Sequence, residues 1–297
     1  EMRIVLAEHF SIDRLVLQEH QISADTTEKY LFQLKDNQHI ESVLIPEKDH
    51  FTLCVSSQVG CAMDCRFCLT AKGGLVRNLT VGEIIAQIRD ARSFLIEKGM
   101  DPLSLSNLVF MGMGEPLANY GNLIKALRII TDTDFGLKFS PRRVTVSTSG
   151  LLPQIKKLGQ ESDVNLAVSL NATTDALRTK LMPVNRKYPL ADLLETCRTF
   201  QMKPRNKITF EYILMKGVND APEDARKLVT LLRPVKAKVN LIPYNEHDHG
   251  EFKRPERETI TRFLQVLLDA GMTAITRKSK GDDILAACGQ LKAKLIK

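Results

Sequence analysis

Short apolar runs alternate with segments of helical periodicity from residue 105 onward. Runs such as LSNLVFMGM (105–113) and VNLAVSL (164–170) have the length of buried strands. Segments such as YGNLIKALRII (120–130) repeat apolar residues at the spacing of one helix face. About six such units follow one another, which predicts a parallel sheet with the active site at the carboxyl ends of its strands. Six units are fewer than the eight of a closed barrel, so we expect an α/β fold, a partial (β/α)6 barrel.

The chain before these units follows a different pattern. KYLFQL (29–34), HIESVLI (39–45) and FTLCVSS (51–57) are short strand-like runs separated by charged turns. They predict a small N-terminal β extension on the barrel. We therefore divide the chain into an N-terminal accessory segment, residues 1–50, and a main domain, residues 51–297.

Composition limits the class of protein. Hydrophobic residues make up 43% of the chain and charged residues 26%, as in ordinary globular proteins. No apolar run approaches the roughly 18 residues of a membrane span, and no basic and apolar leader precedes the first strands, so we expect a cytoplasmic protein. The net charge of +7 favours a polyanionic partner, nucleic acid first, although many basic enzymes never bind RNA.

Three of the six cysteines lie in CAMDCRFC (61–68), with the spacing C-x3-C-x2-C. Structural zinc takes four ligands, usually from two C-x2-C pairs, and only His50 lies near as a spare ligand. A ferredoxin-type cluster also takes four thiolates. Cys61, Cys65 and Cys68 would leave one iron of a [4Fe–4S] cluster open to a substrate or cofactor. This spacing after a first strand is typical of radical S-adenosylmethionine (SAM) enzymes.

A glycine-rich stretch, MGMGEP (111–116), ends the next strand. Glycines there let the backbone approach a ligand closely. In radical SAM enzymes such a stretch contacts the amino group of SAM, and Glu115 could accept a hydrogen bond from that ammonium. The alternative is a plain strand-to-helix turn in which Pro116 sets the backbone angle.

Further motifs narrow the resemblance. RRVTVSTSG (142–150), VNLIPYN (239–245) and RKSKGDDILAACGQL (277–291), with those above, resemble the RlmN family of adenine-C2 RNA methyltransferases from about residue 39 to residue 291. The sister family Cfr, which methylates adenine C8, shares the cysteine pattern, but GEP, STSG and LIPYN look more like the C2 family. The resemblance implies a radical SAM barrel, and it makes residues 1–50 the remnant of a larger RNA-binding region.

The resemblance also implies the site residues. Cys61, Cys65 and Cys68 bind the [4Fe–4S] cluster. Asn171 occupies a SAM-binding position where many members carry histidine. Glu41 aligns with a proton acceptor, although a strand glutamate is more often exposed. The positions that bind SAM are Gly114, Glu115, Ser147, Ser169, Leu170, Asn171 and Asn245.

Two more cysteines complete the implied mechanism. Adenine C2 is an electron-poor carbon that does not attack a sulfonium, so a carbon radical is needed. Cys288 takes a methyl group from SAM as a thiolate, and a 5′-deoxyadenosyl radical removes hydrogen from it. The methylene radical adds to C2, Cys54 or Glu41 takes the C2 proton, and Cys54 forms a disulfide with Cys288 that frees the base. Alternatively both thiols are small buried hydrophobes, the role we assign to Cys197.

The implied partners are 23S rRNA and tRNA, with an external one-electron donor such as flavodoxin. We expect a monomer with no membrane partner. A different class of function stays open, an iron–sulfur or zinc RNA-binding protein without methyl transfer. A target base must be splayed out of folded RNA while cations hold the backbone. Candidate cations are Arg142, Arg143, Arg186, Lys187, Arg277, Lys278 and Lys280, each of which could equally be an ordinary solvated side chain.

Overall fold

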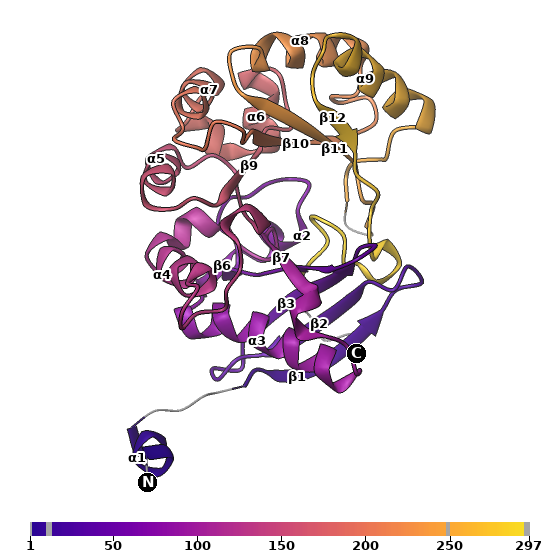
Figure 1. The fold of residues 1–297 in the computed structure, drawn as a ribbon. Coiled ribbons are helices and arrows are strands. Elements are labelled where there is room, and N and C mark those ends of the chain that lie inside the picture. The colour runs from indigo at the N-terminus through magenta and orange to yellow at the C-terminus, as the bar shows by residue number, and fades with distance from the viewer. Residues whose placement is uncertain (1, 10–13, 248–249, 294–297) are drawn as a thin grey trace.

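The computed structural model describes residues 2–9, 14–247 and 250–293 (Figure 1). Within these residues, one ten-stranded sheet has the order β1-β2-β3-β4-β7-β8-β9-β10-β11-β12. A separate hairpin pairs β5 with β6. The strands are β1 (Val16–Ile22), β2 (Glu28–Gln33), β3 (His39–Pro46), β4 (Phe51–Cys54), β5 (Gln58–Gly60), β6 (Leu75–Asn78), β7 (Leu105–Phe110), β8 (Val144–Thr148), β9 (Asn165–Ser169), β10 (Ile208–Leu214), β11 (Ala237–Pro243) and β12 (Ala274–Thr276).

The large sheet combines two pairing patterns. The first four strands are antiparallel neighbours, and the pairs from β4 to β12 are all parallel. The six parallel strands from β7 to β12 confirm the partial (β/α)6 barrel, and β4 adds a seventh parallel strand beside β7. The antiparallel strands β1 to β3 confirm the N-terminal β extension. Because β3 pairs with β4, the sheet runs without interruption across residue 50.

Helices accompany one side of the curved sheet (Figure 1). In α3, Ile84, Ile88 and Leu95 are fully buried, as its apolar spacing predicts, and Thr80 and Glu83 form a capping box at its start. No described helix is both long and apolar enough to cross a membrane. The α-helices are α1 (Met2–His9), α2 (Leu69–Lys72), α3 (Val81–Glu97), α4 (Tyr120–Thr131), α5 (Leu152–Glu161), α6 (Asp175–Leu181), α7 (Leu190–Arg198), α8 (Pro222–Leu232) and α9 (Arg257–Asp269). The short 3-10 helices are η1 (Pro102–Ser104), η2 (Pro116–Asn119), η3 (Pro141–Arg143), η4 (Pro183–Arg186) and η5 (Asp282–Ile284).

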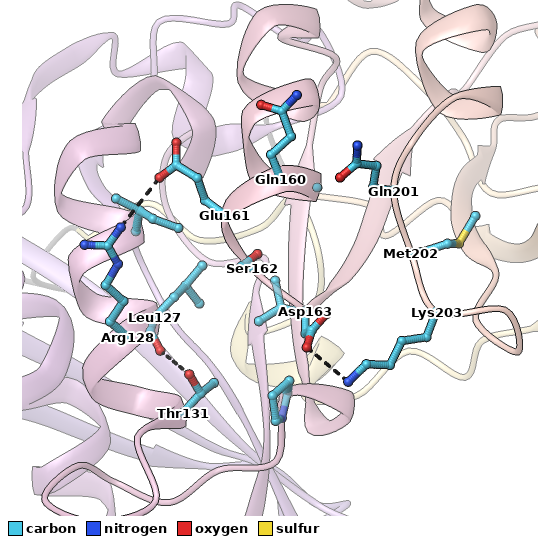
Figure 2. A pocket seen from close by; sticks show the side chains of 14 residues that line it. Leu127, Arg128, Thr131, Gln160, Glu161, Ser162, Asp163, Gln201, Met202 and Lys203 are labelled. Carbon is cyan, nitrogen blue, oxygen red and sulfur yellow. Dashed lines mark hydrogen bonds and ion pairs between the residues drawn. The ribbon is translucent and has the colours of Figure 1, made fainter.

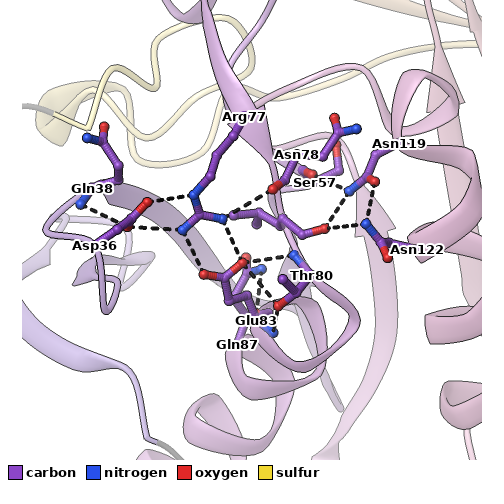
Figure 3. A network of polar contacts seen from close by, with 11 residues as sticks. Asp36, Gln38, Ser57, Arg77, Asn78, Thr80, Glu83, Gln87, Asn119 and Asn122 are labelled. Atoms are coloured by element: carbon purple, nitrogen blue, oxygen red, sulfur yellow. Dashed lines mark hydrogen bonds and ion pairs between the residues drawn. The ribbon is translucent and has the colours of Figure 1, made fainter.

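Figure 3 shows a polar network that fixes the chain just after the cysteine loop. Arg77 of β6 donates to the carboxylates of Asp36 and Glu83. Asn119 Nδ2 donates to the carbonyl oxygens of Ser57 and Leu79 at 2.9 and 2.7 Å. These bonds tie the β5–β6 hairpin to the extension and to α3, so the loop that the hairpin carries has a rigid base.

The C-terminal segment, residues 277–293, returns from β12 to the N-terminal extension. In Figure 1 this yellow segment lies beside the indigo strands. The N–H of Ala24 donates to Asp283 Oδ2 at 3.0 Å, and the N–H of Gly281 donates to Asp25 Oδ2 at 3.3 Å. The segment therefore bridges the two ends of the open sheet.

Candidate functional site

The strand register gathers the predicted side chains on one face of the sheet. In-register neighbours point to the same side of a sheet, as do residues two apart along a strand. Following the pairing from β3 to β10 places Glu41, Cys54 and Ser147 on the same side as Ser169 and Glu211. Five residues that are far apart in the sequence thus share one surface.

This shared face lies opposite the helices. Ser42, which follows Glu41 and faces the other way, donates to Gln87 Oε1 of α3 at 2.8 Å. Lys29 faces the same side as Glu41, and its Nζ donates to the carbonyl of Ile284 in the C-terminal segment at 2.6 Å. The C-terminal segment therefore lies against the inner face of the N-terminal β extension.

The three predicted cluster ligands lie on one short loop between β5 and α2. The N–H of Cys61 donates to the carbonyl of Gly74 at 2.8 Å, which closes the base of the loop. Gly60 has a φ of +73°, and a Cβ there would lie 1.9 Å from the same carbonyl, so only glycine allows this closure. The N–H of Cys68 donates to the carbonyl of Cys65 at 3.1 Å, which makes the ligand region a compact turn.

The surroundings of these thiols fit a [4Fe–4S] cluster. Burial raises the pKa of Cys61 to about 12, and burial together with the neighbouring thiols raises the pKa of Cys65 well above its ordinary value. Such thiols become thiolates only beside strong positive charge, which bound iron supplies. Cys65 and Cys68 also pack against an apolar cluster that includes Phe67 and Met182. An apolar shell of this kind limits the access of water to a cluster.

Within the described chain, no three Cys, His, Asp or Glu side chains converge on a point suited to a single metal ion. A tetrahedral zinc draws its ligands together at zinc–sulfur distances of about 2.3 Å. In a [4Fe–4S] cluster each thiolate binds a different iron, so the protein sulfurs stand farther apart. Cys61, Cys65 and Cys68 are three thiols on one short loop, which is one thiol for each of three irons of such a cluster.

Gly114 and Glu115 follow β7 at the carboxyl edge of the sheet. Gly114 has a φ of +98°, and a Cβ there would lie 2.5 Å from Gln58 Cβ. The buried Glu115 carboxylate accepts the N–H groups of Ser149 at 2.7 Å and Leu117 at 3.1 Å. Burial raises the pKa of Glu115, and these hydrogen bonds oppose that rise. Glu115 therefore ties β7 to β8 and keeps acceptor capacity for an ammonium group.

Arg178 organises the neighbouring strand ends, and sequence analysis missed it. Ser147 and Ser169 lie half-buried near the carboxyl ends of β8 and β9. The fully buried Arg178 guanidinium donates to the carbonyls of Ser149 at 2.6 Å and of Ser169 and Leu170 at 3.2 Å. Burial lowers the pKa of Arg178 to about 10. The cation therefore holds the backbone at the predicted SAM-binding positions.

The side chain of Asn171 already has structural partners. Its Oδ1 accepts the N–H of Ile213 at 2.8 Å, and its Nδ2 contacts Met182 Sδ at 3.3 Å. Its carbonyl accepts a hydrogen bond from Asn219 Nδ2 at 2.8 Å. The amide thus fastens β10, and the backbone N–H of Asn171 is the better candidate for a contact with SAM.

Asn245 connects the end of β11 to the C-terminal segment. Its Nδ2 donates to the carbonyl of Cys288 at 3.2 Å, and its Oδ1 accepts from Ser279 Oγ at 2.5 Å. This predicted SAM-binding residue therefore also holds the backbone of the predicted nucleophile.

Cys54 and Cys288 share one neighbourhood with the cluster loop. Cys54 is buried at the end of β4. Its pKa is raised, mainly by burial and to a smaller extent by the nearby Cys288. Desolvation is the main cause that raises the pKa of Cys288, and the nearby Glu211 and Cys68 raise it further. Arg277 opposes them and lowers it. Cys288 is nevertheless exposed to solvent, although many protein atoms surround its sulfur. The packing alternative is therefore wrong for Cys288.

Glu41 is buried, so the alternative of an exposed strand residue is wrong. Its Oε2 accepts the N–H of Lys292 at 2.8 Å, and its Oε1 lies 3.5 Å from Lys29 Nζ. Glu41 lines a cavity of about 170 Å³ together with Gln290 and Leu285 of the C-terminal segment.

A larger cavity, of about 640 Å³, lies away from these residues (Figure 2). It is lined by residues that precede β8, β9 and β10, so it opens at the amino ends of the parallel strands. Ion pairs lie along it, Lys203–Asp163 at 3.0 Å and Arg128–Glu161 at 3.8 Å. Because catalytic side chains of parallel α/β folds gather at the carboxyl ends, we do not assign the chemistry to this cavity.

Comparisons with known proteins agree with this geometry. The sequence profile of the Radical SAM superfamily matches residues 55–229. A dual-specificity RNA methyltransferase RlmN from Desulfosudis oleivorans is 59% identical over 296 residues, which cover 100% of this chain and 79% of that protein. A dual-specificity RNA methyltransferase RlmN from Geobacter sulfurreducens is 54% identical, over 99% of this chain and 79% of its own length. The chain belongs to the RlmN family.

A solved structure supports the same assignment. The crystal structure of a radical SAM methyltransferase from Sphaerobacter thermophilus superposes with a TM-score of 0.93 at 45% identity. The match covers 99% of this chain and 85% of that one. The RlmN family belongs to the radical SAM methyltransferases, which use a [4Fe–4S] cluster and SAM, and Cys61, Cys65 and Cys68 offer the donor set for the cluster.

The structure places the predicted cations of this RlmN-family chain at different ends of the barrel. Arg142 and Arg143 lie in η3, directly before β8, so they flank the amino end of the barrel and not the end with the cysteines. Arg277 and Lys278 are exposed just after β12, at the start of the segment that carries Cys288. The pattern of charges alone could not separate the two ends of the barrel, because that separation depends on where each strand begins.

Proposed function

We propose that this chain methylates C2 of adenine in 23S rRNA and tRNA through an S-methylcysteine formed at Cys288. The observation that carries the proposal is the meeting of two thiols, Cys54 and Cys288, with a three-cysteine loop on the inner face of the barrel. A thiol pair outside the cluster distinguishes this chemistry from simple electron transfer or metal storage. Because the chain covers 79% of the first relatives, most of such an enzyme is present.

Cys288 is the proposed methyl carrier. Its sulfur must lose a proton before it attacks the methyl group of SAM. The nearby Arg277 lowers the pKa of Cys288 against desolvation and Glu211, both of which raise it. The hydrogen bond from Asn245 to the Cys288 carbonyl holds the backbone of the nucleophile.

Cys61, Cys65 and Cys68 would hold the cluster, which supplies the electron that cleaves a SAM molecule to a 5′-deoxyadenosyl radical. The backbone around Gly114 and the Glu115 carboxylate would orient the amino group of that SAM molecule. The remaining contacts are proposed at Ser147, Ser169, Leu170, Asn171 and Asn245.

Cys54 is the proposed resolving thiol. Once the carbon on the Cys288 sulfur has bonded to C2, and the C2 proton and the unpaired electron have left the adduct, Cys54 attacks that sulfur. The disulfide forms as the carbon–sulfur bond breaks, and the released carbon takes up a proton to become the methyl group of the base. All six cysteines are free in the structure, so Cys54 and Cys288 form no disulfide there. The C2 proton goes to Cys54 or to Glu41.

The proposed partners follow the same chemistry. Arg277 and Lys278 would hold RNA phosphates beside the Cys288 segment. An external one-electron donor such as flavodoxin would reduce the cluster. We propose a cytoplasmic monomer in which residues 1–50 are the remnant of a larger RNA-binding region and residues 51–297 form the methyltransferase domain.

The decisive experiment is mass spectrometry of digested RNA after incubation with anaerobically reconstituted enzyme, SAM and a reductant. We expect 2-methyladenine from wild type, none from Cys288→Ala, and a covalent protein–RNA adduct from Cys54→Ala. Cys197→Ala, which removes a thiol buried in the core, is the matched control and should form product. 8-Methyladenine would assign the chain to the sister chemistry, and normal turnover by Cys54→Ala would show that the resolving role is wrong.

A further inference from the structure

Lys29 is a buried lysine to which the mechanism above gives no role. It lies on β2, its side chain is only 9% exposed, and it faces the inner side of the sheet. Lysine is seldom buried to this degree unless its charge is paired. Two partners satisfy it here, the carbonyl of Ile284 at 2.6 Å and Glu41 Oε1 at 3.5 Å.

The contacts of the Lys29–Glu41 pair are placed evenly about Cys288. Lys29 Nζ binds the carbonyl of Ile284, four residues before Cys288 in the sequence. Glu41 Oε2 accepts the N–H of Lys292, four residues after it, at 2.8 Å. One ion pair thus fixes both ends of the stretch 284–292 and leaves the thiol at its centre.

Between these two contacts the stretch bonds to the helix that follows the cluster loop. The N–H of Leu69 donates to the carbonyl of Gly289 at 2.7 Å, and Thr70 Oγ1 donates to the carbonyl of Leu291 at 2.7 Å. Gly289 also lies close to the cluster loop, since a Cβ there would be 3.2 Å from the carbonyl of Phe67. The position of the stretch therefore sets the position of Cys288 relative to the cluster ligands.

We propose that Lys29, with Glu41, is a positioning residue. The pair clamps the stretch 284–292 to the N-terminal β extension and so holds the Cys288 sulfur where its methyl group can react. This inference rests on the proposed role of Cys288 as methyl carrier. It gives the extension a part in methyl transfer itself, in addition to any part in RNA binding. It holds whichever group takes the C2 proton, because Lys29 is not a candidate for that step.

A loosened clamp predicts uncoupling of the two half-reactions. The cluster ligands lie on a separate loop, so cleavage of SAM continues when the clamp is lost. Removal of hydrogen from the S-methyl group needs the Cys288 sulfur in place. The yield of methylated adenine for each 5′-deoxyadenosine formed should therefore fall, whereas a general loss of folded enzyme would lower both products equally.

The test compares wild type, Lys29→Met and Lys29→Arg as cluster-loaded enzymes. Hydrogen exchange of the amides in 284–292 measures the clamp directly, without turnover. In Lys29→Met we expect this exchange to accelerate by roughly tenfold or more, because hydrogen bonds to charged groups are among the stronger ones. The yield per 5′-deoxyadenosine should fall by roughly tenfold, as expected for a misplaced reacting group. Lys29→Arg keeps the charge and should restore most of both.

Lys98→Met is the matched control. Lys98 pairs with Glu28, the neighbour of Lys29 on the opposite face of β2, so its loss breaks an ion pair of the extension without touching the stretch. We expect wild-type exchange and yield from this variant. If Lys29→Met does not fold, Lys29→Gln carries the same expectations.

Two outcomes would contradict the positioning role of Lys29. One is unchanged amide hydrogen exchange of 284–292 in Lys29→Met, and the other is faster exchange with an undiminished yield of methylated adenine per 5′-deoxyadenosine. A third outcome bears on the methyl chemistry alone. If wild type forms no methylated adenine while exchange still separates Lys29→Met from Lys98→Met, the proposed function is wrong and the contact between extension and stretch stands.

Discussion

The loop 61–68 and the stretch 284–292 meet at one site but are built in different ways. The loop closes within its own hairpin, through the bond from Cys61 to Gly74. The stretch is held from the far end of the chain, by Lys29 at a separation of 255 residues and by Glu41 at 251. A local loop can carry a recognisable spacing, whereas a long-range anchor exists only in the folded protein.

The largest expected effect comes from removing one cysteine from each region and comparing the activities that are lost. Cys65→Ala should abolish the cluster, because two thiolates no longer hold it, and with it all cleavage of SAM. Cys288→Ala should keep wild-type iron and sulfide content and form no methylated RNA. Iron and sulfide analysis of anaerobic samples, beside mass spectrometry of the RNA, measures both. Loss of the cluster in Cys288→Ala would show that the stretch also supports the cluster loop, and the two regions would then not be independent.

The same contrast decides how much of the site the sequence could predict. The spacing of the three clustered cysteines predicts their function, and the glycine-rich stretch at Gly114 follows a strand as expected. The alternation of strands and helices predicted the parallel sheet. Each of these signals is local, so it can be recognised without knowledge of the fold.

Lys29 and Arg178 show what the sequence could not predict. Lys29 stands in KYLFQL and Arg178 in DALRTKL, where an isolated charge normally indicates a solvent-exposed position. Both are buried because carbonyl groups from distant segments surround them. Strand β1 escaped prediction for a related reason: it is mostly exposed and polar, and its pairing with β2 depends on the turn between them.

A second prediction concerns Arg178, the buried cation that holds the strand ends near the cluster ligand Cys65. Arg178→Lys keeps the charge but loses the planar fork that reaches three carbonyls, so we expect destabilisation of about 2–4 kcal/mol. Urea unfolding measures this loss. Affinity for SAM should fall as well, because Ser169 and Leu170 lose their support. Arg198→Lys is the control, since its ion pair with Glu195 is exposed and such pairs contribute little. Equal stability of the two variants would show that the fork of Arg178 is not the anchor.

Glu211 lies on β10, on the face of the sheet that carries Ser169, and close enough to Cys288 to raise the pKa of that thiol. It shares the face of Ser169 on one side and accepts a hydrogen bond from Asn240 Nδ2 at 3.0 Å on the other. Burial raises the pKa of Glu211 above its ordinary value, although Asn240 and Arg277 lower it. A buried carboxyl of this kind favours the folded state when it is protonated. Its contribution is therefore complete below the ordinary pKa, near 4.5, and is lost as the pH rises through the folded value.

The smallest expected effect follows from this pH dependence of the stability contribution of Glu211. Glu211→Gln keeps the acceptor for Asn240 and removes the buried charge, so the variant should be more stable than wild type by about 1 kcal/mol at neutral pH. The advantage should shrink as the pH falls toward 4.5, because wild-type Glu211 then gains its proton. Urea unfolding of both proteins between pH 5 and pH 7.5 measures the difference, with the exposed Glu195→Gln as control. A difference that stays constant across this range would mean that Glu211 is not desolvated, and the inner face of β10 would then be wetter than its burial indicates.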